Sequence, residues 1–164
     1  MSTQAFGINT GSSFDDSSLG NIKSIKQIAL SQGWLVDCMK VTYNMADGST
    51  KVGNHLGSGT PNVTIDFDSS EVLIGVTGRL GMVGYYSNDP YLCSVSFIIL
   101  NHATGKVREA GPYGAGGPSS SYTESPIFNI AGEIKCFSGK LLTESSDPTN
   151  ALTLMFPTSQ VVGA

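Results

Sequence analysis

The residues best suited to catalysis or metal binding are few and widely separated. The two histidines are His55 and His102, and neither has a second His or a Cys at the spacing of a metal site. Asp15 and Asp16 are adjacent carboxylates, which on a strand would point to opposite faces, so we interpret them as a solvated turn and not as an acid–base pair. Sequence signatures of nucleophile elbows, phosphate-binding loops and zinc sites are absent. These observations predict a binding protein with no metal or cofactor, and not an enzyme.

The cysteines also predict no metal or redox site. Cys38, Cys93 and Cys136 are an odd number of widely spaced residues, each among apolar neighbours. This pattern is neither a disulfide framework nor a metal motif. We therefore expect three buried, reduced thiols.

Charge and length exclude several classes of partner. The 164 residues carry a formal net charge of −4, and only 13% are charged. An acidic chain lacks the basic face that nucleic acids and anionic membranes require, and no apolar run is long enough to span a bilayer. The N-terminus has neither a basic start nor an apolar segment typical of a secretion signal. We expect no nucleic-acid partner, no membrane insertion, and a cytoplasmic or non-classically secreted protein.

The elements expected to position a binding site are short strands. Period-two alternation and β-branched content predict strands at 22–28, 34–43, 63–68, 72–76, 95–100, 133–137 and 151–156. The first could also be an amphipathic helix, because Ile22, Ile25 and Ile28 recur every third residue, but bounding glycines favour a strand. Asp47-Gly48 and Thr104-Gly105 predict hairpin turns. The pattern predicts an all-β fold and leaves a sandwich, a barrel and a prism open.

Four groups of short motifs occur in order along the chain. They are Gly11-Ser12-Ser13-Phe14-Asp15-Asp16 with Val41-Thr42-Tyr43, Asp47-Gly48-Ser49 with Gly53-Asn54-His55, Ile65-Asp66-Phe67 with 71–78, and Gly111-Pro112-Tyr113-Gly114 with 132–139. Together they resemble the jacalin-related lectins, over nearly the whole chain. The resemblance implies an all-β fold of the β-prism I type, with three four-stranded antiparallel Greek-key sheets around a pseudo-threefold axis. It also implies one lectin domain over 1–164, with its core at about 11–156.

The resemblance places a sugar site in loops at one end of the prism. The first loop contains Gly11, whose small size would let the backbone approach a hydroxyl closely. The last loop follows Ser138-Gly139 and includes Gly139, Lys140 and Leu141.

In the family, this last loop carries Gly-x-x-x-Asp, whose carboxylate accepts hydrogen bonds from two sugar hydroxyls. Here Thr143 stands where the Asp belongs. If the loop is longer, Asn150 takes the Asp position, and Asp147 is a third candidate that could equally cap a turn.

A third loop, between Gly81 and Cys93, supplies further candidates. Tyr85 and Tyr86 could stack on the apolar face of a sugar, or could anchor the loop on the core. Asn88 and Asp89 could bind sugar hydroxyls.

The resemblance implies a lectin that recognises mannose- or glucose-type glycans, because the chain is similar to the uncleaved, mannose-type branch. The partners would be glycans or glycoproteins. A shallow polar pocket binds weakly, so a homodimer or higher oligomer would supply avidity. The altered Asp favours an alternative, a β-prism protein-interaction module that has lost sugar binding.

Overall fold

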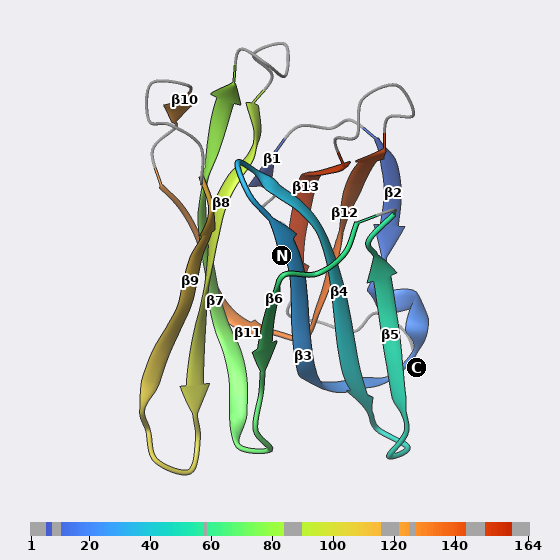
Figure 1. The fold of residues 1–164 in the computed structure, drawn as a ribbon. Helices are drawn as coiled ribbons and strands as arrows, with labels where there is room; N and C mark the ends of the chain where they lie inside the picture. Colours follow the sequence, from blue (N-terminus) through green and yellow to red (C-terminus); the bar gives the residue numbers. More distant parts are fainter. Residues whose placement is uncertain are drawn as a thin grey trace.

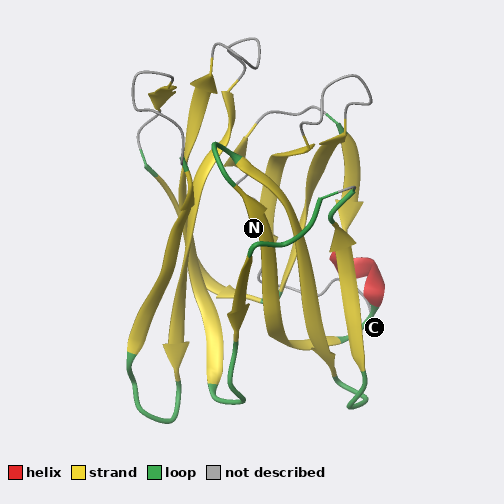
Figure 2. Ribbon diagram, viewed as in Figure 1, coloured by secondary structure: helices red, strands yellow, loops and turns green. Residues whose placement is uncertain are grey.

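The structure, a computed structural model, is built almost wholly of antiparallel strands arranged in three sheets (Figures 1 and 2). It describes residues 6–7, 11–57, 59–83, 90–115, 122–124, 127–143 and 150–158. One short 3-10 helix, η1 (Asp16–Leu19), follows the second strand. No helix in these described ranges is long and apolar enough to cross a membrane.

The first sheet has four strands in the order β5-β4-β3-β6. Their bounds are β3 (Ile22–Gln32), β4 (Val36–Met45), β5 (Thr50–His55) and β6 (Val63–Asp66). Three hairpin-connected strands with the fourth beside the first form a Greek key. The predicted turn at Asp47-Gly48 joins β4 to β5, where Met45 N donates to Ser49 O at 2.9 Å.

The second sheet has the order β10-β7-β8-β9, and β11 also pairs with β7. Its strands are β7 (Glu71–Val83), β8 (Pro90–Asn101), β9 (Val107–Gly114), β10 (Tyr122–Glu124) and β11 (Phe128–Ile134). The expectation of four strands is wrong for this sheet, which has five. The reason is that β10 pairs with the far end of β7 from Gly81 onward while β11 pairs with its earlier part, so two short strands share one edge.

The third sheet joins the two ends of the chain. Its order is β1-β13-β12-β2, with β1 (Phe6–Gly7), β2 (Ser12–Asp15), β12 (Cys136–Thr143) and β13 (Asn150–Thr158). When β12 and β13 are counted before β1 and β2, this sheet has the same Greek-key order as the other two. The β-prism expected from the sequence is confirmed, with its third Greek key closed through the termini.

Alternating apolar side chains from all three sheets meet in one core. The largest fully buried side chains include Tyr43, Phe97 and Phe137, from the first, second and third sheet respectively. Phe97 and Phe137 contact edge to face, with ring centroids 6.4 Å apart, which is a favourable aromatic geometry. Cys38, Cys93 and Cys136 are buried and free, so the prediction of reduced thiols is confirmed.

The strand predicted over 22–28 is confirmed as part of β3, but the single strand predicted over 133–137 is wrong. The chain leaves the second sheet at Ile134 and enters the third at Cys136. Both of these residues are buried. The alternation of apolar residues therefore continues from one strand into the next, and the sequence pattern does not show that the chain changes sheet. Lys135 lies at the crossing and donates to Lys23 O at 3.2 Å.

Candidate functional site

The described connections that carry the predicted sugar site lie at one end of the prism, which we call the loop end. Here β3 turns into β4 through 33–35, β9 ends at Gly114, and β12 ends at Thr143. Leu35, Tyr91 and Cys93 form a small apolar cluster there, and Leu142 and Ala115 pack against it. This cluster holds the ends of all three Greek keys together.

Gly11 lies against the β12 strand at the loop end. Its φ is +102°, and a Cβ at this position would lie 2.5 Å from Leu141 O. Only glycine fits both the positive φ and the close approach. The structure therefore brings together Gly11 and Leu141, which the sequence predicted as parts of one site.

Gly139, Lys140 and Leu141 are not in a loop, as the sequence predicted, but within β12. They pair with Phe14, Ser13 and Ser12 of β2. The strand continues to Thr143, which lies opposite Asn150 of β13. The expectation that the last loop begins after Gly139 is wrong, because two further leucines continue the β12–β13 ladder.

The remaining predicted residues divide into two groups. Asn150 begins β13 and closes the β12–β13 pairing. Asp147, Tyr85 and Tyr86 lie outside the described residues, as do Asn88 and Asp89. Tyr91, the next tyrosine along, is 8% exposed in strand β8 and anchors the small apolar cluster at the loop end.

A stretch that does have the spacing Gly-x-x-x-Asp, Gly33-Trp34-Leu35-Val36-Asp37, was not among the predicted site residues. The β3–β4 connection holds the same place in the first Greek key as the β12–β13 connection holds in the third. The spacing itself could have revealed this stretch, once the repeated Greek key was considered.

Hydrogen bonds fix the Gly33–Asp37 stretch at the loop end. Asn62 brackets the end of β3, with its Nδ2 donating to Gln32 O at 2.7 Å and its Oδ1 accepting from Gln32 N at 3.2 Å. The Gln32 side chain accepts from Gly114 N at 2.8 Å. Ala115 N donates to Trp34 O at 3.1 Å. The hairpin is thereby bonded to the end of the second sheet.

Asp37 is a half-buried carboxyl group with little hydrogen-bonding support. Burial raises its pKa from 3.8 to about 6, against a smaller lowering by Ser31. The Ser31 hydroxyl donates to Asp37 Oδ2 at 3.5 Å, which is long for a strong hydrogen bond. At neutral pH this carboxylate therefore retains acceptor positions that a ligand hydroxyl could use.

Trp34, three residues before Asp37 in the same hairpin, has an exposed aromatic side chain. Its side chain is 40% exposed, while its neighbour Leu35 is buried in the small apolar cluster. An exposed indole and a hydrogen-bond acceptor in the same hairpin suit a ligand with one apolar and one hydroxyl-bearing face.

The Asp15–Asp16 pair is not the solvated turn that the sequence predicted. Asp15 is exposed and caps η1, its side chain accepting from Ser17 N at 2.9 Å. Asp16 is only 2% exposed. Its carboxylate accepts from Tyr43 Oη and contacts His55 Nε2, each at 2.6 Å. Among the described residues, no group of three or more His, Cys, Asp or Glu side chains could hold a metal ion.

Comparisons with known proteins agree with this architecture. Residues 3–143 match the Jacalin-like lectin domain. A mannose-specific jacalin-related lectin from Morus nigra superposes with a TM-score of 0.67 at 22% identity, covering 94% of this chain and 90% of the other.

Two further solved structures have the same fold. A mannose-binding jacalin-related lectin from Ananas comosus gives a TM-score of 0.65 at 22% identity, covering 94% and 96% of the two chains. Frutapin, a lectin from Artocarpus incisa, gives 0.69 at 20% identity, covering 94% and 93%.

No curated protein matches the chain. Proteins with the Jacalin-like lectin domain bind carbohydrates and are not enzymes. Because the domain match spans most of the sequence, the chain belongs to the jacalin-like lectin family.

Proposed function

We propose that this protein is a lectin that binds mannose- or glucose-type glycans at its loop end. Family membership supports carbohydrate binding in general. The mannose preference rests on two of the similar structures, which are described as mannose-binding or mannose-specific. The observation that carries the choice of site is the pairing of an exposed indole, Trp34, with a half-buried carboxylate, Asp37, in one short hairpin.

The proposed contacts follow the chemistry of a pyranose ring. Asp37 accepts hydrogen bonds from two neighbouring hydroxyls, and Trp34 covers the apolar face of the ring. A second set of contacts is proposed around Gly11 and Leu141, with Asn150 or Asp147 supplying the polar side chain. The position of Gly11 supports this second set. Gly11 lies close to Leu141 of β12 and has no side chain, so a sugar hydroxyl could reach the backbone there.

Binding at each site is weak in this proposal, because a shallow polar surface buries little apolar area. Avidity would come from two sites on one chain, and from a homodimer or larger assembly. Size-exclusion chromatography with light scattering measures the assembly directly.

A glycan array followed by calorimetry tests the proposed function. We expect signal on mannose- or glucose-terminated glycans, and loss of affinity of about tenfold for Asp37→Asn or Trp34→Ala if each removes one good contact. Asp147→Ala and Asn150→Ala, singly and together, test the second set of contacts. Glu133→Gln is the matched control, because Glu133 is an exposed carboxylate on β11, outside the proposed contacts.

The alternative is a β-prism that binds protein and not sugar, which the Thr at position 143 favours. A folded protein that gives no signal on any glycan would favour this alternative and contradict the lectin proposal. Affinity unchanged in all the variants would place the sugar elsewhere on the molecule.

A further inference from the structure

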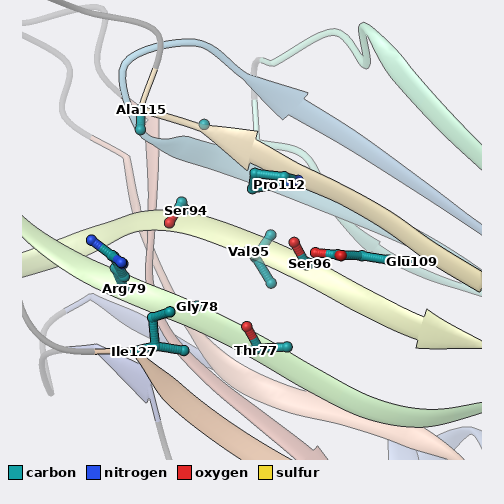
Figure 3. A pocket seen from close by; sticks show the side chains of 11 residues that line it. Thr77, Gly78, Arg79, Ser94, Val95, Ser96, Glu109, Pro112, Ala115 and Ile127 are labelled. Atoms are coloured by element: carbon teal, nitrogen blue, oxygen red, sulfur yellow. The ribbon is translucent and has the colours of Figure 1, made fainter.

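A pocket of about 430 Å³ lies on the second sheet. Two of its lining residues, Gly114 and Ala115, donate to Gln32 and Trp34, so one end of the pocket adjoins the Gly33–Asp37 hairpin. Side chains that line it come from neighbouring strands β7, β8 and β9 (Figure 3). Because Val76, Val95 and Phe97 of the same strands belong to the buried core, the lining residues Thr77, Ser94 and Ser96 alternate with them and face outward. The pocket is therefore a hollow in the outer face of the prism.

Small residues form the floor of this pocket. Gly78 and Gly114 both line it. A Cβ on Gly78 would lie 2.5 Å from Ser94 O, and a Cβ on Gly114 would collide with Cys93 O. The strands approach so closely here that only glycine fits, and the missing side chains leave the hollow above the sheet.

Ser96 is a buried polar residue that faces this hollow. It is 4% exposed and lines the pocket. Within the described part of the chain its hydroxyl has no hydrogen-bond partner, although every fully buried side-chain N or O atom there has one. The hydroxyl is therefore not fully enclosed, and it can donate to or accept from a molecule that occupies the pocket.

Opposite charges stand on the two sides of this hydroxyl. Figure 3 shows Arg79 on one side of Ser94 and Ser96, and Glu109 on the other. Glu109 makes no ion pair or hydrogen bond with another described residue. The guanidinium only donates and the carboxylate only accepts, whereas serine hydroxyls do both. Ile127, 52% exposed, adds an apolar rim.

We propose that this pocket is a further saccharide site, in addition to the contacts proposed at the loop end, and that it binds a neutral pyranose unit. A ligand here must accept from Arg79 and donate to Glu109, and sugar hydroxyls can do both. An apolar ring face suits Ile127. The charges of Arg79 and Glu109 offset one another, so the pocket carries no net charge to attract an ion and suits a neutral polyol. The pocket volume is within the usual range for a small-ligand site.

The test is an NMR titration of the full chain, following backbone amides by chemical shift. The probes are the methyl α-pyranosides of mannose, glucose and galactose, with methyl glucuronoside as the anionic comparison. We expect shifts at 77–79 and 94–96 with at least one neutral probe. Ser96→Ala and Glu109→Gln are expected to weaken this binding about fivefold each, as for loss of one hydrogen bond.

Glu133→Gln is the matched control, because Glu133 is an exposed carboxylate on β11 that does not line the pocket. It should leave the pocket shifts unchanged. Glu109 is also exposed, so its variant tests the pocket without threatening the fold.

Three results would overturn this inference: no shift at 77–79 and 94–96 with any neutral probe, shifts there with the glucuronoside alone, or shifts that both pocket variants leave unchanged. The amides of 33–37 report separately on the loop end. Shifts confined to 33–37 contradict the pocket site and leave the proposed function intact. Shifts confined to 77–79 and 94–96 support the pocket site and contradict sugar binding by the Gly33–Asp37 hairpin.

Discussion

The hydroxyl of Tyr43 donates a hydrogen bond to Asp16 Oδ2 at 2.6 Å, and both residues are buried in the prism. His55 Nε2 lies 2.6 Å from the other carboxylate oxygen, and the imidazole stacks on Phe14 with ring centroids 3.7 Å apart. The Tyr43 hydroxyl also accepts from Phe137 N at 3.3 Å. Burial, with the charge of Asp16, raises the pKa of Tyr43, so it remains a donor. This network joins the first sheet, η1 and the third sheet.

Tyr43→Phe should destabilise the protein by about 1–3 kcal/mol, because it removes the donor to Asp16 Oδ2 and the hydroxyl that accepts from the Phe137 amide, both in a buried place. The measurement is the free energy of unfolding from urea denaturation. Tyr113→Phe is the matched control, since no described residue bonds the Tyr113 hydroxyl. Equal effects of the two variants would contradict a structural role for the network.

Gly53→Ala should also destabilise the protein. Gly53 is buried against the Asp16 carboxylate, and a Cβ there would collide with both carboxylate oxygens. Overpacking of this kind costs about 1–3 kcal/mol, and displaced Asp16 would lose its partners too. Thermal unfolding measures the loss, with Gly33→Ala as the control because a Cβ at position 33 meets open space. A variant as stable as wild type would show that Asp16 can move freely.

The role of Asp16 shows what the sequence could not predict. Asp15 and Asp16 are adjacent and chemically identical, yet one is exposed and the other is buried. What separates them is contact with Tyr43 and His55, which are 27 and 39 residues away along the chain. Local pattern describes alternation within a strand, and it contains no information about which distant side chains a carboxylate will meet.

The strands, in contrast, could be predicted well, because burial of every second residue produces an alternation of apolar and polar residues in the sequence. Ile65 is buried between the exposed residues Thr64 and Asp66, as the alternation predicts. The alternation does not reveal where the chain passes from one sheet to another, as it does at Lys135. For the site, the resemblance predicted Gly11 and Leu141 as parts of one sugar site, and the structure shows that the two residues are neighbours. The Gly33–Asp37 stretch became visible only when the three Greek keys could be compared.

Asp37→Asn separates stability from binding. Because burial raises the pKa of Asp37 from 3.8 to about 6, the folded protein binds more protons than the unfolded chain within this window. Its stability therefore falls as the pH rises from about 4 to about 6. The Asn variant lacks this loss, and at pH 7 it should be as stable as wild type or up to about 1 kcal/mol more stable, after allowance for partial exposure.

The same substitution should weaken sugar binding in the proposed site, since it removes the charged acceptor. In wild type, the affinity should fall as the pH falls through about 6, where Asp37 becomes protonated. Calorimetric titrations with methyl α-mannopyranoside across this window measure the effect. A pH-independent affinity, equal in wild type and variant, would remove Asp37 from the site.

Arg108→Lys should cost about 0.5–1 kcal/mol, more than an ordinary exposed pair, because the lysine cannot reproduce the planar fork. Arg108 donates from Nε and Nη2 to the two oxygens of Glu71, at 2.8 and 3.0 Å, and from Nη2 to Asp66 O at 2.8 Å. It thus ties β9 and β7 of the second sheet to β6 of the first. Its bond lowers the pKa of Glu71, so this stabilisation is present above the unfolded pKa and is lost as the pH falls through the folded one.

Urea denaturation at a series of pH values descending from neutral checks the claim. Protonation of Glu71 should narrow the gap in unfolding free energy between Arg108→Lys and wild type. Glu133→Gln is the comparison, since its ion pair is with Lys135, two residues along the chain, and is at the surface. A loss no larger for Arg108→Lys than for Glu133→Gln would mean that the two sheets are held together here by packing alone. A larger loss that persists at low pH would instead assign the stabilisation to the bond with the Asp66 carbonyl, which no titration removes.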